Sequence, residues 1–155
     1  MPVSSFYHWS KDHGYTLTGS GPLVSVEISI PAALKQHLSD KGQPIPAPQS
    51  GFALIDTGAF ATAVDQSIFD ALGIAPIDKM PTATPHGDGE SPIYPASVTF
   101  PGLGVSEMPM EKLIGCKLRW KTVEDKEIIM LLGRDLLQYF LMVYNGKSAD
   151  VFLAW

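Results

Sequence analysis

The stretch Ala53-Leu54-Ile55-Asp56-Thr57-Gly58-Ala59 decides the expected fold of this chain. Residues 51–55 are a short apolar run, which predicts a buried strand, and the run stops abruptly at Asp56. Residues 64–72 then show the spacing of a helix that begins near Asp65 and ends at Gly73. The sequence therefore places a carboxylate just past a buried strand, at a turn.

Short strands joined by turns are expected on both sides of this stretch. Fourteen Gly and 13 Pro are spread through the chain and interrupt long helices, which favours a mostly β fold. Residues 21–30 alternate apolar and polar side chains, as a half-buried strand does. The other predicted elements are a short helix at 31–38, a hairpin over 77–100 with its tip at 86–91, a hairpin over 117–132, a helix at 134–141, a two-residue turn at 145–146 and a paired strand at 151–155.

Length and composition indicate one folded domain. The chain has 155 residues, of which 45% are hydrophobic and 17% charged, so it can form a core. We expect residues 1–20 to be an N-terminal tail and residues 21–155 to be a single domain. The domain carries a Pro-rich insertion at about 31–50, whose prolines favour an extended connector.

Charge and cysteine content exclude several classes of partner and site. Eleven Lys and Arg against 16 Asp and Glu give a net charge of −5 without a basic cluster, so a nucleic-acid partner is not expected. Cys116 is the single cysteine, which excludes an internal disulfide and a Cys-rich zinc site and fits a reducing compartment. The histidines lack metal-binding spacing, so neither a metal nor a cofactor is expected. No signal peptide or membrane-spanning run is recognisable, and we expect a cytoplasmic protein without a membrane partner.

A second motif lies near the C-terminal end, Leu131-Leu132-Gly133-Arg134-Asp135-Leu136-Leu137. Together with Asp56-Thr57-Gly58 it resembles the retropepsin-like (retroviral-type) aspartic proteases, in particular their bacterial branch. The Asp-Thr-Gly turn resembles the active-site turn of that family, and the second motif resembles the segment that opens its C-terminal helix. The resemblance spans residues 21–155. It implies an all-β fold, a closed acid-protease barrel with one or two short helices, functional as a homodimer.

The chemistry of such a site can be stated independently of the resemblance. Amide hydrolysis without a metal requires one group that deprotonates water and another that protonates the leaving nitrogen. Two carboxyls about 3 Å apart can do both, because they share one proton. This chain offers one Asp turn of the required kind, at Asp56, and no second one. An aspartic endopeptidase built from it needs a second copy of the chain, which predicts a symmetric homodimer acting on a peptide or protein substrate.

The residues of the turn take their expected roles from the resemblance. Asp56, Thr57 and Gly58 are the expected catalytic residues: the Thr57 hydroxyl would brace the two turns of the dimer, and Gly58 lets the backbone approach the carboxylate and the substrate. Ala59 and Phe60 are expected to contact substrate. Ala59 brings no hydroxyl where pepsin-like enzymes have Ser or Thr, so we expect an activity optimum nearer neutral pH than that of pepsin.

The hairpin over residues 77–100 would be the flap that closes over a bound peptide. Its tip supplies the other expected substrate-binding residues, which are Thr84, Pro85, His86, Gly87, Asp88 and Gly89. The acidic residues at this tip favour basic or neutral substrates over acidic ones.

Gly133, Arg134 and Asp135 are expected to be structural. Members of the family commonly have Asp or Ser at the position of Phe60, and the acidic version pairs with the arginine that corresponds to Arg134. Since Phe60 cannot form this pair, Arg134 must bond either to a backbone carbonyl or to Asp135.

Two other functions are compatible with parts of the sequence. Phe60 departs from the family pattern, which fits a catalytically inactive peptide-binding or dimerisation module on the same scaffold. Residues 55–62 also loosely resemble the phosphate loops of actin-like ATPases. That reading is disfavoured, because 155 residues cannot supply the two large domains that close around the nucleotide in those enzymes.

Overall fold

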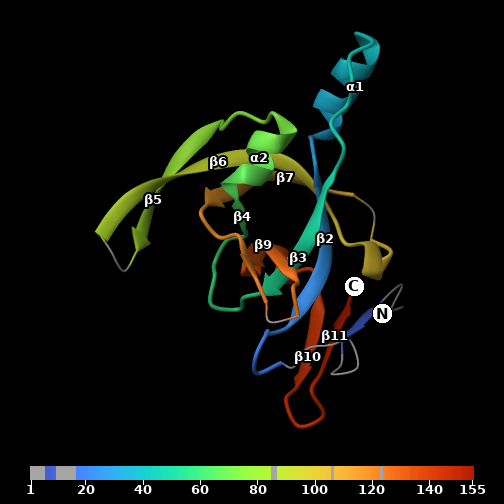
Figure 1. Ribbon diagram of the computed structural model, residues 1–155, viewed down its shortest axis with the longest axis vertical. Coiled ribbons are helices and arrows are strands. Elements are labelled where there is room, and N and C mark those ends of the chain that lie inside the picture. The colour runs from blue at the N-terminus through green and yellow to red at the C-terminus, as the bar shows by residue number, and fades with distance from the viewer. Residues whose placement is uncertain (1–5, 10–16, 85–86, 106, 123) are drawn as a thin grey trace.

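A closed barrel of six strands forms the body of the protein in the computed structural model (Figure 1). The structure describes residues 6–9, 17–84, 87–105, 107–122 and 124–155. Around the barrel the strands are β2 (Leu23–Ser29), β3 (Gln49–Ile55), β9 (Glu127–Leu132), β4 (Ala63–Asp65), β7 (Met108–Cys116) and β6 (Gly87–Thr99). Pairing of β2 with β6 closes the ring. The predicted mostly β fold with few short helices and a closed barrel is confirmed.

Strand β2 shows how the sequence pattern builds the core. Val24, Val26 and Ile28 are at most 1% exposed, whereas Ser25 and Glu27 between them are only half-buried. This is the predicted alternation of a strand with one buried face. Strands β3 and β9, which precede the two sequence motifs, run parallel to each other, so their C-terminal ends lie side by side.

A long hairpin of β5 (Asp78–Thr84) and β6 extends from the barrel (Figure 1). The prediction of this hairpin is confirmed, but the predicted tip at 86–91 is too long. Gly87 pairs with Thr84 and Ser91 with Met80, so residues 87–91 belong to β6. Pairing with β5 thus keeps Gly87 and Gly89 in a strand, although glycine favours turns. Residues 85–86, between the two strands, lie outside the described residues.

A second sheet, of three strands, lies below the barrel in Figure 1 and contains the first and the last of the described strands. Its order is β1 (Phe6–Trp9), β11 (Asp150–Ala154) and β10 (Leu141–Asn145). The predicted pairing of the C-terminal strand is therefore confirmed, and β1 comes from the segment expected to be a tail. The predicted two-residue turn at 145–146 is wrong, because Asn145 pairs with Asp150 and leaves a four-residue loop. The Asn145 side chain accepts hydrogen bonds from the backbone N–H groups of Lys147 and Ser148 at 3.2 and 3.3 Å, which stabilises the longer loop.

Short helices and two minor elements complete the fold. Helix α1 (Ala32–Asp40) projects from the barrel and buries no residue, and it lies in the predicted insertion (Figure 1). Helix α2 (Gln66–Leu72) begins after Asp65 and ends at Gly73, as predicted. Helix α3 spans only Arg134–Leu137, whereas the prediction extended it to Leu141, which instead begins β10 and is 65% exposed. The minor elements are the 3-10 turn η2 (Pro101–Leu103) and the strand β8 (Trp120–Lys121), which pairs with β9.

Helix α3 is short because the chain tightens immediately after it. The N–H groups of Tyr139 and Phe140 donate to carbonyls three residues earlier, a geometry that ends an α-helix. Among the helices of the described segments, none has the length and apolar character needed to cross a membrane.

Candidate active site

Asp56 lies at the C-terminal end of β3, where the chain leaves the barrel wall. Its backbone N–H donates to the carbonyl of Leu132 at the end of β9, at 3.0 Å. Its carboxylate oxygen Oδ1 accepts hydrogen bonds from the backbone N–H groups of Gly58, at 2.9 Å, and Ala59, at 3.2 Å. The side chain is half-buried, and Thr57 and Gly58 beside it are exposed. The turn therefore fixes the carboxylate while leaving it accessible from outside.

Gly58 is needed for the close approach of this turn to its own carboxylate. A Cβ atom at position 58 would lie 3.1 Å from Oδ1 of Asp56, tighter than ordinary van der Waals contact. The hydroxyl of Thr57 forms no hydrogen bond with a described residue, so it remains available to a group outside this chain.

Arg134, the first residue of α3, stabilises the Asp56 turn through hydrogen bonds from its backbone and its side chain. Its backbone N–H donates to the carbonyl of Ala59 at 2.9 Å. Its guanidinium Nη1 donates to the carbonyls of Thr57, at 2.8 Å, and Gly58, at 3.2 Å. Of the two partners predicted for Arg134, the backbone carbonyl is confirmed. The Arg134 side chain thus fixes the carbonyl groups of Thr57 and Gly58, the two residues that follow Asp56.

Asp135 bonds to the other end of the turn, at Thr62. Its Oδ1 and Oδ2 accept hydrogen bonds from the Thr62 hydroxyl, at 2.6 Å, and the Thr62 N–H, at 3.0 Å. The same hydroxyl accepts from the N–H of Gly133 at 3.1 Å. A Cβ at Gly133 would lie 2.5 Å from the backbone of Ala61, so only glycine permits this contact. Thr62, which is fully buried, is a site residue that the sequence analysis missed.

The structure brings the expected site residues together in two groups. Arg134 bonds to Thr57, Gly58 and Ala59, next to Asp56, and Gly133 and Asp135 bond to Thr62 at the end of the same turn. The remaining expected residues lie on the separate β5–β6 hairpin: Thr84 ends β5 opposite Gly87, and Asp88 and Gly89 are exposed on β6. Phe60 is 61% exposed just after the turn. Pro85 and His86 lie outside the described residues.

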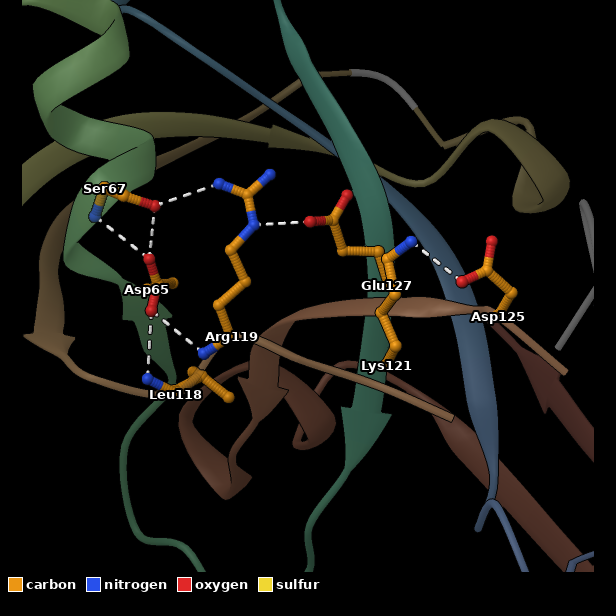
Figure 2. A network of polar contacts seen from close by, with 7 residues as sticks. All are labelled: Asp65, Ser67, Leu118, Arg119, Lys121, Asp125 and Glu127. Carbon is orange, nitrogen blue, oxygen red and sulfur yellow. Dashed lines mark hydrogen bonds and ion pairs between the residues drawn. The ribbon is translucent and has the colours of Figure 1, made fainter. Parts of the chain in front are cut away.

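A second carboxylate, Asp65, is buried in a separate polar network (Figure 2). It accepts hydrogen bonds from the N–H groups of Leu118 and Arg119, both at 2.9 Å, and from the N–H and hydroxyl of Ser67. Burial by itself raises the pKa of Asp65, but these hydrogen bonds outweigh it and hold the pKa below its ordinary value. Because its oxygens are already occupied, Asp65 ties α2 to the segment after β7 rather than offering a catalytic group.

Arg119 continues this network toward β9. Its guanidinium donates to Glu127 and, at 3.2 Å, to the hydroxyl of Ser67. The bond from Arg119 lowers the pKa of Glu127. Lys121 forms an ion pair with Asp125 at 2.8 Å, drawn beside this network in Figure 2. The sequence predicts the start of α2 at Asp65, but not this link across 53 residues to Leu118.

A hollow of about 350 Å³ lies beside the Asp56 turn. It is lined by Thr57, Arg134, Leu137, Gln138 and Met142. Over the segments that the structure describes, no group of three or more His, Cys, Asp or Glu side chains is placed to hold a metal ion.

Comparison with known proteins adds no assignment. Neither the models of protein families nor the curated proteins give a match to this chain. The geometry of the Asp56 turn and its surroundings is therefore the basis for a functional proposal.

Proposed function

We propose that this chain is an aspartic endopeptidase of the retropepsin-like kind, in which a homodimer brings two copies of Asp56 together. The observation that carries the proposal is the accessible Asp56 carboxylate, fixed by two backbone N–H groups on a turn that Arg134 and Asp135 hold. A carboxylate fixed in this way at a strand end is oriented before any substrate binds, as a catalytic group must be.

The proposed reaction is hydrolysis of a peptide bond by water. One Asp56 carboxylate takes a proton from the water, whose oxygen attacks the peptide carbonyl carbon, while the protonated Asp56 of the second copy donates its proton to the peptide nitrogen. The carbon–nitrogen bond then breaks, and the nitrogen leaves as an amine with the transferred proton. Because neither a metal nor a cofactor takes part, the pair of carboxyls must be complete before any cleavage occurs.

The outer strand β10 supports the proposal of a dimer. It is the last strand of its sheet, and Leu141, Val143 and Tyr144 on it are 65%, 48% and 51% exposed. An exposed apolar strand at a sheet edge is a surface that pairs readily with another chain. Met142 of the same strand lines the hollow beside Thr57. A second copy docked on β10 would therefore reach the Asp56 turn as well.

The β5–β6 hairpin supports an extended peptide as the substrate. In the proposed dimer the hairpin roofs the Asp56 turn, and a cleft between a roof of strands and a fixed turn offers main-chain hydrogen bonds to a peptide in the strand conformation. The substrate class is therefore a peptide or an unfolded protein segment.

Substitution of Asp56 tests the catalytic proposal directly. Asp56→Asn keeps the size of the side chain but removes the base, so we expect cleavage of a peptide mixture to fall at least about a hundredfold, as when a general base is lost. Asp40→Asn, on the exposed helix α1, is the matched control and should cleave like the unmodified protein. Peptidase activity that survives unchanged in Asp56→Asn would refute the assignment.

Phe60 favours one other function, a peptide-binding module without catalysis. Its exposed ring stands where the family pattern has a polar residue, so the turn lacks that polar contact to substrate. Incubation with peptides and with a statine-type inhibitor of aspartic proteases separates the two functions. Binding without Asp56-dependent cleavage between pH 3 and 8 would favour the module.

A further inference from the structure

A hollow of about 420 Å³ lies where the start of β7 meets the end of β11 and the chain that follows α3. The residues that line it include Glu107, Met108, Met110, Tyr139, Phe140 and Trp155. Leu141 pairs with Ala154 across β10 and β11, so Phe140 and Trp155, which adjoin these two residues, lie near each other. The two methionines are two positions apart on β7 and therefore share a face of that strand. Among the described residues, those of the Asp56 turn do not line this hollow.

Three aromatic side chains give this hollow its chemistry. Tyr139 and Trp155 are 63% and 41% exposed, so the protein leaves much of each ring uncovered. Phe140 is half-buried, and its ring lies edge-to-face with that of Phe100, with the ring centres 5.9 Å apart. The face of an aromatic ring carries negative potential and attracts cations. The two half-buried methionines add polarisable thioether groups beside the rings.

Glu107 adds a negative charge to the same hollow. Its carboxylate accepts hydrogen bonds from Nζ of Lys35 and from the Ser29 hydroxyl, both at 3.1 Å. The bond from Lys35 is the main reason why the pKa of Glu107 lies below its ordinary value, so the carboxylate is ionised at neutral pH. Glu107 lines the hollow and Lys35 does not. A ligand in the hollow therefore meets the carboxylate and not the ammonium group.

The bonds that Glu107 already makes restrict the kind of cation that fits. A metal ion or a primary ammonium group gives up bound water and needs free oxygen atoms in exchange. A quaternary ammonium group donates no hydrogen bond, and its charge is covered by methyl groups that can contact aromatic rings and thioethers. Such a cation needs only the negative potential of the rings and the carboxylate.

We infer that this hollow binds a quaternary ammonium cation, the group found in choline and in the side chain of trimethyllysine. Tyr139 and Trp155 would contact its methyl groups, and Glu107 would supply the opposite charge. The volume of the hollow lies in the range of small-molecule sites, about 300–1,000 Å³. This binding goes beyond the proposed peptidase activity and does not depend on it, because Asp56 takes no part.

Calorimetric titration of the full chain with choline tests the inference. The matched ligand is the neutral alcohol in which a tert-butyl group replaces the trimethylammonium group of choline, since it has the same shape without the charge. We expect choline to bind at least about fivefold more tightly, as contacts between a cation and aromatic rings predict. Equal binding of the two ligands would overturn the inference, and so would the absence of choline binding up to about 10 mM.

Substitutions in the hollow test whether choline binds there. Trp155→Leu and Tyr139→Leu should each weaken choline binding about five- to 30-fold. Trp120→Leu is the matched control, because Trp120 is also 41% exposed but lines a different hollow. Unchanged binding in both hollow variants would overturn the inference. Asp56→Asn should bind choline like the unmodified protein, so loss of cleavage in that variant and loss of choline binding in the hollow variants are separate results.

A peptide that carries trimethyllysine, titrated beside its unmethylated form, distinguishes the two sources of the cation. Tighter binding of the methylated peptide than of choline would assign the hollow to a modified protein, and the reverse order would assign it to a free small molecule. Tighter binding of the unmethylated peptide would overturn the inference, because a primary ammonium group would then be the better ligand.

Discussion

Asp135 accepts two hydrogen bonds from Thr62, one from its hydroxyl at 2.6 Å and one from its N–H at 3.0 Å. The two residues are 73 positions apart in the sequence: Thr62 follows the Asp56 turn, and Asp135 belongs to the second motif. Their contact therefore fixes the end of the Asp56 turn against the start of α3. The site depends on this long-range contact as much as on the residues of the turn itself.

Thr62→Val should destabilise the protein by about 1–3 kcal/mol, the usual cost of leaving buried polar groups unpaired. Valine keeps the shape of threonine but removes the hydroxyl bond to Asp135 and leaves the Gly133 N–H without its partner. The free energy of unfolding in urea measures the loss. Thr99→Val is the control, because the Thr99 hydroxyl bonds to no residue in the described part of the chain. Equal losses in the two variants would show that the Asp135 contact contributes nothing.

Gly133→Ala should lower stability by about 1–3 kcal/mol or more, as overpacking does. The new Cβ would lie 2.5 Å from the backbone carbonyl of Ala61, which cannot move away as the tip of a side chain can. Gly89→Ala is the matched control, since its Cβ would meet nothing within 4 Å. Thermal unfolding should separate the two variants, and a Gly133→Ala protein as stable as Gly89→Ala would contradict the packing described here.

Asp65→Asn should make the free energy of unfolding less dependent on pH in the acid range. Folding lowers the pKa of Asp65 from its ordinary value of 3.8, so the unfolded chain takes up this proton more readily than the folded chain. The stabilisation by the carboxylate is thus complete above pH 3.8 and declines as the pH falls through the folded value. Asn also weakens the bonds to Leu118 and Arg119, by about 1–3 kcal/mol near neutral pH.

Urea unfolding between pH 2.5 and 7 measures this difference. The curve of Asp65→Asn should lie below that of the unmodified protein at pH 7 and approach it in acid, whereas Asp40→Asn should run parallel to the unmodified protein. Parallel curves for all three proteins would exclude the proposed linkage.

Val143→Lys should weaken the proposed dimer at least about tenfold. The charge would stand on the exposed outer strand β10, where lysine opposes strand pairing. Sedimentation across a range of concentrations measures the association, and cleavage should fall in proportion to the dimer lost. Ile45→Lys, on the Pro-rich segment, should leave the molecular mass in solution the same as that of the unmodified protein. A protein that stays monomeric at every concentration without any substitution would contradict the dimer itself.

Local rules predict much of this fold from the sequence. The alternation in residues 21–30, the start of α2 at Asp65 and its end at Gly73 each depend on neighbouring residues, and each is found where predicted. The mostly β content follows from the same local patterns, whereas the closed barrel was predicted only through the family resemblance.

Long-range pairing explains what the sequence did not predict. Strand β4 has three residues and exists because β7 and β9 flank it. The shorter α3 follows from the pairing of Leu141 with Ala154 in the second sheet. The roles of Thr62 and Asp65 depend on partners 73 and 53 positions away, and no local pattern marks such partners.

The link between Arg134 and the carbonyl of Thr57 spans 77 positions, so the order of synthesis matters for this chain. During translation the Asp56 turn leaves the ribosome well before Arg134 and before strand β10. Until Arg134 has been synthesised, the turn lacks the hydrogen bonds from its guanidinium. Until β10 has been synthesised, the surface on which a second copy would dock is absent. In the proposed dimeric enzyme, cleavage would therefore begin only after the chain has been synthesised through Arg134 and β10.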